Sequence, residues 1–390
     1  MSPADLQSAR RDGADALRQG RPQDALACFQ QIIDQGRPDP AVWIAAAMAR
    51  GMLGDRPGEL AALQEALKLN PRDARALLMC GDNHTASGDN RAAQAYYQAF
   101  LRLAATTGDM TLRAELPRVR QLSEANDAAF SGHLEAALQP LALDQPHARR
   151  MQRALNILLG RSELYLQQPK AFYFPELPNV EYAEREWFPW LGRVEAATDD
   201  IRRELLGVLQ DEGAFAPYIE AEPNRPFFDN GLLGNPDWSA FYLWKSGVPV
   251  AENAARCPAT MAALAEAPLC RIPGRTPSIL FSLLRPGMHI QPHTGFMNSR
   301  YICHLPLIVP DGCAMRVGSQ TRTWVEGQAC VFDDSIEHEA WNKNPDHLRV
   351  VLIFDVWRPE LTEAERVFVS SALQAVDSYG RGGETEPGGL

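Results

Sequence analysis

Three glycines at equal intervals constrain the fold of the first third of the chain. Gly20, Gly54 and Gly88 are separated by 54 − 20 = 34 and 88 − 54 = 34 residues. Each opens a similar phrase, namely Gly-Arg-Pro-Gln-Asp-Ala-Leu-Ala, Gly-Asp-Arg-Pro-Gly-Glu-Leu-Ala and Gly-Asp-Asn-Arg-Ala-Ala-Gln-Ala. A repeat of this length is a single supersecondary unit that cannot bury its apolar face alone, so the spacing predicts helix pairs stacked on their neighbours.

A second set of positions keeps the same period. Phe29, Leu63 and Tyr97 each follow a repeat glycine by nine residues. A helix-turn-helix period of 34 residues is that of the tetratricopeptide repeat, and about three repeats are the minimum for stability. We expect residues 1–110 to form an α-solenoid of this kind; a plain helical bundle is the alternative. Its concave surface would suit a peptide or protein, but assembly or packing against the rest of the chain also remains open.

The remaining sequence predicts a helical linker and then a β domain. Residues 111–165 continue in helical patterns without a repeat, with helices expected at 112–128, 131–143 and 148–159, and we expect them to cap the solenoid. After one expected helix at 190–209, residues 166–375 carry short apolar phrases separated by turns, which are typical of an all-β sandwich or barrel and suit a jelly roll. The phrases span 238–244, 278–284, 301–309, 314–317, 320–324, 329–332 and 349–357. Residues 376–390 end in a glycine-rich polar tail that we expect to be disordered. The predicted fold class is therefore multidomain α and β.

Composition narrows the possible partners and compartment. The formal net charge is −11, which argues against a nucleic-acid partner because phosphate binding normally requires a basic patch. No apolar run is long enough to span a membrane, and the N-terminus lacks the apolar region of a secretory signal. The seven cysteines are odd in number and scattered, which favours reduced thiols. We therefore expect a cytoplasmic location.

Two histidines and an arginine predict an iron site. His293 lies in His-Ile-Gln-Pro-His-Thr-Gly, His338 follows it by 338 − 293 = 45 residues, and Arg349 follows His338 by 349 − 338 = 11. Neutral imidazoles suit Fe(II), and a guanidinium can pair both oxygens of the distal carboxylate of 2-oxoglutarate. In the common triad of two histidines and one carboxylate, an acid follows the first histidine by two residues, but Gly295 occupies that position here. The local acids that could replace it are Asp333, Asp334 and Glu337.

Several phrases between residues 172 and 362 resemble the aspartyl/asparaginyl β-hydroxylase family of 2-oxoglutarate oxygenases. They are Pro292-His-Thr-Gly295, Asn298-Ser-Arg300, His304-Leu, Trp324-x-x-Gly327, Phe332-Asp-Asp-Ser335, His338-Glu-x-Trp341 and Phe354-Asp-Val-Trp-Arg-Pro-Glu360. The resemblance implies a double-stranded β-helix domain that holds iron with two histidines and no carboxylate, a water being the third ligand. Some family members also carry tetratricopeptide repeats. The family hydroxylates the β-carbon of Asp or Asn in peptides, and relatives act on free amino acids or lipid A acyl chains.

The resemblance assigns further residues to the site. Ser282 and Trp238 would line the 2-oxoglutarate pocket with Arg349, and His304 would face the carboxylate next to the keto group. Arg300 would grip a carboxylate or amide of the substrate. Ile302 departs from the animal enzymes of the family, which have a second arginine there.

The expected function is hydroxylation of the β-carbon of Asp or Asn in a peptide or protein by an Fe(II)- and 2-oxoglutarate-dependent dioxygenase. His293 and His338 would hold the metal, O₂ would be consumed, and succinate and CO₂ would be the coproducts. The peptide would be a partner that the repeats help to engage. One alternative is hydroxylation of a free amino acid, small molecule or lipid acyl chain, with the repeats serving assembly. A second is a non-enzymatic scaffold. The sequence leaves the oligomeric state open.

Overall fold

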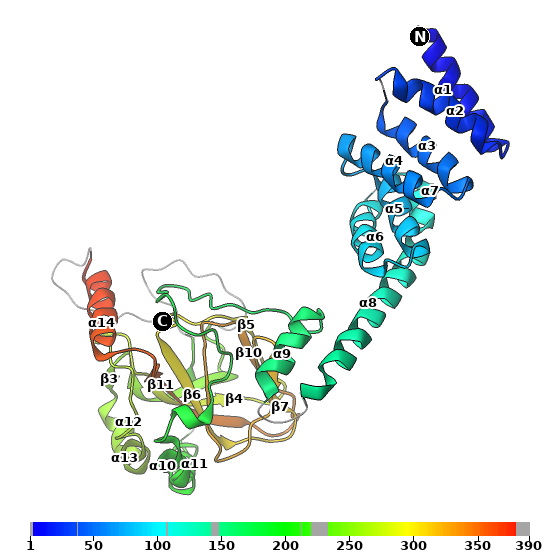
Figure 1. Ribbon diagram of the computed structural model, residues 1–390. Coiled ribbons are helices and arrows are strands. Elements are labelled where there is room, and N and C mark those ends of the chain that lie inside the picture. The colour runs from blue at the N-terminus through cyan, green and yellow to red at the C-terminus, as the bar shows by residue number, and fades with distance from the viewer. Residues whose placement is uncertain are drawn as a thin grey trace. The chain divides into compact units, whose positions relative to one another are not determined.

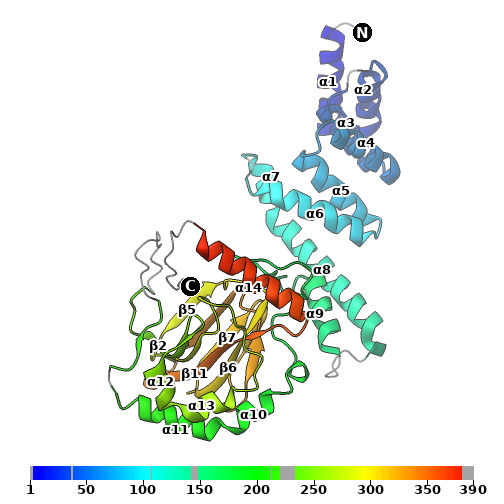
Figure 2. The same cartoon turned by 90° about the vertical axis from the view of Figure 1, so that its left-hand side faces the viewer.

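The chain folds as two compact units. The computed structural model describes residues 3–36, 38–106, 108–141, 148–211, 213–219 and 233–379. Its contacts divide the chain into Met1–Ala154 and Leu155–Leu390, drawn in Figures 1 and 2. The first unit is helical, and the second contains all of the strands. The division falls before residue 165, where the sequence predicted the end of the helical linker.

Paired helices of similar length build the first unit (Figure 1). The pairs are α1 (Pro3–Arg18) with α2 (Pro22–Asp34), α3 (Pro40–Met52) with α4 (Arg56–Leu69), and α5 (Ala74–Ala86) with α6 (Asn90–Ala104). Gly20, Gly54 and Gly88 lie in the turns within the pairs, with φ of 67°, 76° and 76°. Glycine adopts this left-handed conformation without the strain that a Cβ introduces. The 34-residue period therefore marks one recurring turn, and the predicted helix pairs are confirmed.

Large side chains pack against small ones in this unit. Phe29, Leu63 and Tyr97 are buried with exposures of 2%, 0% and 0%. A Cβ added to Gly13 would meet the Phe29 ring, and one added to Gly81 would overlap the Tyr97 ring. The helices within these pairs therefore approach closely where glycine faces an aromatic ring.

The helices after the repeats differ in detail from the expected ones. They are α7 (Met110–Ala114), α8 (Leu116–Leu138), the short 3₁₀ helix η1 (Gln139–Leu141) and α9 (Arg149–Leu158). Helix α8 continues through residues 129–130, where the sequence predicted a break between two helices.

Two antiparallel sheets form the centre of the second unit. The larger has the order β1-β2-β4-β11-β6-β9, with β3 paired to β2, and the smaller has the order β5-β10-β7-β8. The strands are β1 (Ala216–Pro217), β2 (Trp238–Lys245), β3 (Val248–Pro249), β4 (Ile279–Leu284), β5 (His289–His293), β6 (Arg300–Ile308), β7 (Cys313–Val317), β8 (Gln320–Arg322), β9 (Cys330–Phe332), β10 (His338–Asn342) and β11 (Arg349–Trp357). Each of the seven predicted strand phrases is a strand, within a few residues at its ends.

One apolar cluster lies between the sheets and another lies on the outer face of the larger sheet. The inner cluster joins Trp238, Leu284, Ile302 and Phe332 of the larger sheet to residues of the smaller one, including Met315. Alternate residues of the larger sheet point outward and bury the helices that cover it, as Figures 1 and 2 show for α10, α11 and α13. Side chains of the inner set therefore point into the interior between the two sheets.

Helices flank the sheets at several places. They are the short 3₁₀ helix η3 (Arg185–Trp187), α10 (Leu191–Ala196), α11 (Thr198–Val208), α12 (Ala251–Arg256), α13 (Pro258–Ala263) and α14 (Glu363–Ser378). The single helix predicted for 190–209 is interrupted at Ala197, and α12 to α14 were not predicted. Because α14 extends to Ser378, residues 376–378 are helical, whereas residues 380–390 of the predicted tail lie outside the described residues. No helix within the described ranges has the length and apolar character to cross a membrane.

Candidate functional site

The two predicted metal-binding histidines lie side by side on the smaller sheet. His293 ends β5, His338 begins β10, and they are direct partners across the antiparallel pair. Their ring centroids are 4.1 Å apart. Each Nδ1 lies near a backbone carbonyl, 2.7 Å from Gln291 O for His293 and 3.0 Å from Ile336 O for His338. Since a carbonyl only accepts, each Nδ1 donates and each Nε2 keeps a lone pair.

Burial keeps both imidazoles neutral. It is the main cause that lowers the pKa of His293 to about 3, with the nearby His338 second. Burial also lowers the pKa of His338 to about 4. Two neutral imidazoles with free Nε2 atoms are suitable ligands for a divalent transition metal. Within the described part of the chain, no group of three or more His, Cys, Asp and Glu side chains is arranged to hold an ion.

A neighbouring carboxylate explains why residue 295 is a glycine. A Cβ added to Gly295 would overlap the carboxylate of Asp334, and the Gly295 N–H donates to Asp334 O at 2.6 Å. Asp334 is 5% exposed, and its Oδ1 has no hydrogen-bond partner among the described residues. Burial raises the pKa of Asp334, while Arg300 and His293 oppose that rise. Asp334, in the loop before β10, therefore occupies the space that a side chain at position 295 would need.

The other two local acids have different surroundings. Asp333 is fully buried and pairs with Arg358 at 2.9 Å, and burial raises its pKa to about 6. Glu337 is partly exposed and pairs with Arg316 at 2.8 Å. Of the three candidates, Asp334 is the one whose carboxylate meets the segment directly after His293.

Arg349 is a buried cation without an acidic partner. It begins β11, is 1% exposed, and its Nη1 donates to the Ser282 carbonyl at 3.4 Å. Its Nε has no hydrogen-bond partner in the described ranges, and no carboxylate of those ranges forms an ion pair with it. Burial lowers its pKa to about 10. An uncompensated buried charge is costly, so this guanidinium is suited to an anion that enters the space between the sheets.

The other predicted cosubstrate residues surround the same space. Ser282 lies on β4, where its Oγ accepts a hydrogen bond from Trp238 Nε1 at 3.3 Å. His304 lies on β6, and its Nδ1 is buried with no partner among the described residues. Burial and then Arg349 hold its pKa well below the usual value. The structure thus brings together Arg349, Ser282, Trp238 and His304, and their predicted contacts with 2-oxoglutarate stay a prediction.

An aromatic wall joins the arginine to the histidines, and sequence reasoning gave it no role. The Trp324 ring centroid lies 5.0 Å from the Arg349 guanidinium carbon and 6.1 Å from the His304 ring centroid. The Phe332 ring lies 4.9 Å from His304 and 5.4 Å from His338, between ring centroids. The buried Trp324 Nε1 also has no partner in the described ranges. Ring contacts therefore run from Arg349 through Trp324, His304 and Phe332 to His338.

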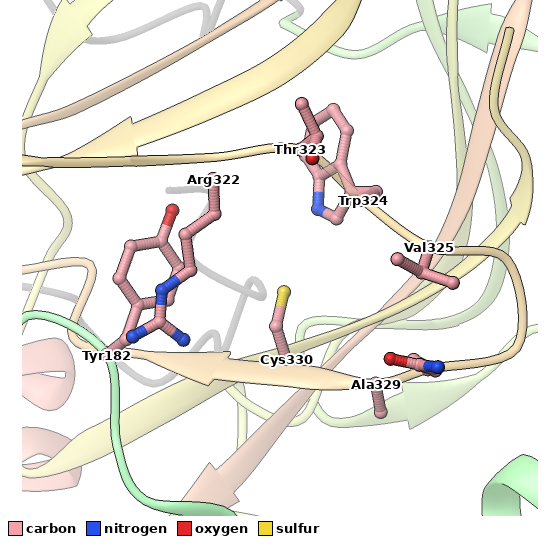
Figure 3. Close-up of a pocket in the computed structure, with 8 residues that line it drawn as sticks. Tyr182, Arg322, Thr323, Trp324, Val325, Ala329 and Cys330 are labelled. Carbon is pink, nitrogen blue, oxygen red and sulfur yellow. The ribbon is translucent and has the colours of Figure 1, made fainter. Parts of the chain in front are cut away.

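Trp324 also borders a cavity that opens near this wall. The cavity measures about 200 Å³ and is shown in Figure 3. Its lining residues are Tyr182, Arg322, Thr323, Trp324, Val325, Gln328, Ala329 and Cys330. The Arg322 guanidinium covers the Tyr182 ring, with the carbon 4.0 Å from the centroid. Trp324 therefore lines this cavity and also contacts Arg349.

Arg300 is held by two carboxylates. It begins β6 and pairs with Asp334 at 3.0 Å and with Asp355 of β11. Only 4% of its surface is exposed, so its charge is compensated within the protein. Its predicted contact with substrate stays a prediction. The pairing with Asp355 could have been predicted from the sequence. Asp355 is a lone acid inside the apolar run of β11, and a buried acid usually has a partner.

Comparisons with known proteins identify a family and several relatives. The family profile described as "Aspartyl/Asparaginyl beta-hydroxylase" matches residues 195–359, which include His293, His338 and Arg349. The mouse protein named aspartyl/asparaginyl beta-hydroxylase is 31% identical over 349 residues, covering 80% of this chain and 43% of its own length. The ornithine lipid ester-linked acyl 2-hydroxylase of Rhizobium tropici is 35% identical over 203 residues, covering 51% of this chain and 68% of its own.

Similar solved structures match the helical part. The crystal structure of PcrH from Pseudomonas aeruginosa covers 32% of this chain and 94% of its own, with 20% identity and a TM-score of 0.30. The chain spans less than half of the length of the mouse relative. The profile, and a relative that is 35% identical over two thirds of its length, place this chain in the aspartyl/asparaginyl β-hydroxylase family.

Proposed function

We propose that this chain is an Fe(II)- and 2-oxoglutarate-dependent dioxygenase that hydroxylates the β-carbon of Asp or Asn residues in a peptide or protein. Membership of a hydroxylase family supports an oxygenase. The proposal of metal and cosubstrate rests on one observation: the buried Arg349, which has no acidic partner among the described residues, lies on the larger sheet, and two neutral histidines are paired on the smaller sheet.

The pocket donors fit a small dicarboxylate. Arg349 presents a planar fork that can pair both oxygens of one carboxylate. Because Trp238 Nε1 already donates to Ser282 Oγ, the Ser282 hydroxyl hydrogen is free to donate to the same ligand. His304, farther along toward His338, would hold the carboxylate beside the keto group. Burying an anion here would also compensate the charge of Arg349.

The histidine pair fits a metal held by few protein ligands. Hydrogen bonds from Nδ1 to backbone carbonyls fix both rings, and such partners orient metal-binding imidazoles. Asp334 fills the space beside Gly295 and keeps a free carboxylate oxygen. We propose that this carboxylate acts through a water rather than as a direct ligand, because its other oxygen is held by Arg300.

Bound Fe(II), 2-oxoglutarate and O₂ together supply the oxidant that hydroxylates a C–H bond and release succinate and CO₂. The protein's part is to orient the target carbon and to exclude water. The strand order supports a double-stranded β-helix for this purpose, since successive strands from β4 to β11 alternate between the sheets, with β7 and β8 together in one of them. Both histidines then lie on one sheet, and Arg349, Ser282 and His304 lie on the other.

A second candidate is hydroxylation of a lipid acyl chain or small molecule. The relative from Rhizobium tropici, named for a lipid acyl 2-hydroxylase, favours it. Ile302, 8% exposed and apolar, also makes this site less basic than the animal enzymes that the sequence resembles. A non-enzymatic scaffold is disfavoured, because a protein that binds no anion gains nothing from burying Arg349.

Mass spectrometry of a peptide library tests the proposal. The library is incubated with protein, iron, ascorbate and 2-oxoglutarate, and products heavier by one oxygen atom are sought at Asp and Asn. Hydroxylated aspartyl or asparaginyl peptides are expected. Oxidised lipid with unmodified peptides would favour the second candidate, and the absence of 2-oxoglutarate turnover with either would refute both.

A further inference from the structure

A strap formed by residues 167–174 crosses the two loops that adjoin the histidine pair, one after β5 and one before β10. Gln168 N donates to Ser335 O at 2.7 Å, three residues before His338. Lys170 N donates to Gly295 O at 2.9 Å, two residues after His293. Ala171 N donates to Phe296 O at 3.0 Å. The backbone at Lys170 is therefore fixed beside both loops.

Side chains anchor the strap at both ends. Asn298 Nδ2 donates to Gln167 Oε1 at 2.9 Å, and its Oδ1 accepts from Phe174 N at 2.7 Å. Gln167 Nε2 in turn donates to Asp333 at 2.6 Å. Because buried hydrogen-bonded networks hold their members in one arrangement, the position of Lys170 is set by the same residues that shape the metal-binding loops.

The side chain of Lys170 is exposed and forms no ion pair with a described residue, although its charge is among the effects that oppose the rise in the pKa of Asp334. Its flexible stem of four carbons carries a compact charge. Because its backbone N–H donates to Gly295 O at 2.9 Å, two residues after His293, a stem of this length can bring the charge to the site. Lys170 therefore places an ammonium group that forms no ion pair among the described residues near the loops next to His293 and His338.

Other cations near the site are already engaged or enclosed. Arg300 pairs with Asp334 and Asp355. Arg349 is buried, and its guanidinium contacts the Trp324 ring. Lysine is also rare in this chain, which has Lys68, Lys170, Lys245 and Lys343 within a total of 38 Lys and Arg. Among the described cations at this site, Lys170 is therefore the one that remains available to pair with a substrate group that enters from solvent.

We infer that Lys170 is a specificity-determining residue that pairs with a carboxylate of the substrate and makes the site prefer aspartyl over asparaginyl peptides. This inference rests on the proposed function and names its substrate class. An amide in place of the carboxylate would lose the charge interaction but keep the rest of the binding surface.

The test compares peptide pairs that differ only in Asp or Asn at the target position. For the wild-type protein, kcat/KM is expected to be higher for the aspartyl member. Lys170→Gln should reduce the ratio of the two values about three- to fivefold, the size of an exposed ion pair, and Lys170→Arg should largely retain it. Lys343→Gln is the matched control, because it removes the same charge from an exposed position at the far end of β10. Added salt should narrow the wild-type preference.

Lysine labelling gives a readout that does not depend on turnover. Acetylation with acetic anhydride is followed at each lysine by mass spectrometry. An aspartyl peptide should protect Lys170 more than its asparaginyl partner does, while Lys343 should react equally with both.

The outcomes separate this inference from the proposed function. If the wild-type protein converts no 2-oxoglutarate, the proposed function fails. If it does, but the Asp/Asn ratio is equal in the wild-type and Lys170→Gln proteins, the inference is overturned and the function stands. Hydroxylation of neither peptide series, or equal labelling of Lys170 with both peptides, would also overturn it.

Discussion

Replacing Arg349 with methionine should stabilise the protein without ligand and abolish its response to 2-oxoglutarate. Methionine fills a similar elongated space without a charge. The guanidinium it removes is 1% exposed and has no acidic partner in the described ranges. Arg349 therefore destabilises the folded state until an anion binds.

The magnitude follows from the pKa of Arg349, which burial lowers from 12.5 to about 10. At about 1.4 kcal/mol per unit, this drop corresponds to a folding penalty of about 3 kcal/mol. The guanidinium is charged in both the folded and the unfolded chain near neutral pH. The whole penalty is therefore present below about pH 10 and fades only as pH rises above it. The contact with Trp324 offsets about 1 kcal/mol, so Arg349→Met should raise the free energy of unfolding by about 2 kcal/mol.

Urea unfolding monitored by tryptophan fluorescence measures this change. Seven of the eight tryptophans lie after residue 154, and Trp43 is the exception, so the signal reports mainly on the second unit. Arg358→Met is the matched control, because Arg358 is also fully buried but pairs with Asp333 and Glu360. Removing it should destabilise the protein by about 3–5 kcal/mol, since Asp333 would be left uncompensated.

A parallel titration with 2-oxoglutarate and Mn(II) should raise the unfolding midpoint of the wild-type protein but not that of Arg349→Met. The reasoning is refuted if Arg349→Met destabilises the protein as much as Arg358→Met does. It is equally refuted if the variant keeps the wild-type affinity for 2-oxoglutarate.

Three further predictions follow from other contacts. Gly295→Asp, which would restore the common iron triad in sequence, should lower both stability and Fe(II) affinity because its Cβ overlaps the Asp334 carboxylate; tighter Fe(II) binding in a metal titration would contradict this. Burial, and after it the charge of Arg349, holds the pKa of His304 well below the ordinary value of 6.5. Below about pH 6.5 the unfolded chain therefore takes up a proton at this residue that the folded chain does not. The free energy of unfolding should be highest above about pH 6.5 and should fall as the pH decreases below it. His304→Gln should make that fall less steep in urea unfolding of the metal-free protein, and an unchanged slope would argue against a neutral buried ring. In the helical unit, Gly88→Ala should lower the free energy of unfolding by about 1 kcal/mol because of the positive φ at this position. Gly81→Ala should lower it by about 1–3 kcal/mol because the added Cβ would overlap the Tyr97 ring. Thermal melts followed by circular dichroism measure both changes, and midpoints equal to that of the wild-type protein would contradict the prediction.

Local periodicity predicted much of the fold. The spacing of Gly20, Gly54 and Gly88 marks turns that require a positive φ, and apolar phrases bounded by turns became strands of the two sheets. Both signals arise from residues close together in sequence. The helix α14 was not predicted, because its buried face is narrow, with Val369 and Leu373 packed inward while Val367 and Phe368 are exposed.

The site could be predicted only in part because its decisive contacts join distant segments. Gln167 donates to Asp333 across 166 residues, and neither residue carries a local sign of the other. The overlap of Gly295 with Asp334 likewise depends on how two loops meet. The pairing of β5 with β10 decides that His293 and His338 are neighbours, whereas their spacing of 45 residues only allows it. Resemblance to a family supplied the residues that chemistry alone left undetermined, such as Ser282 and His304.

Anaerobic titration with Fe(II) and 2-oxoglutarate tests the central claim most directly. A chelate of the two bound at the histidine pair should give a weak visible charge-transfer band with the wild-type protein. His293→Ala and His338→Ala should each remove the band, whereas Lys343→Gln should retain it. A wild-type protein without the band, or a band that is unchanged in both histidine variants, would contradict the proposed iron and 2-oxoglutarate site.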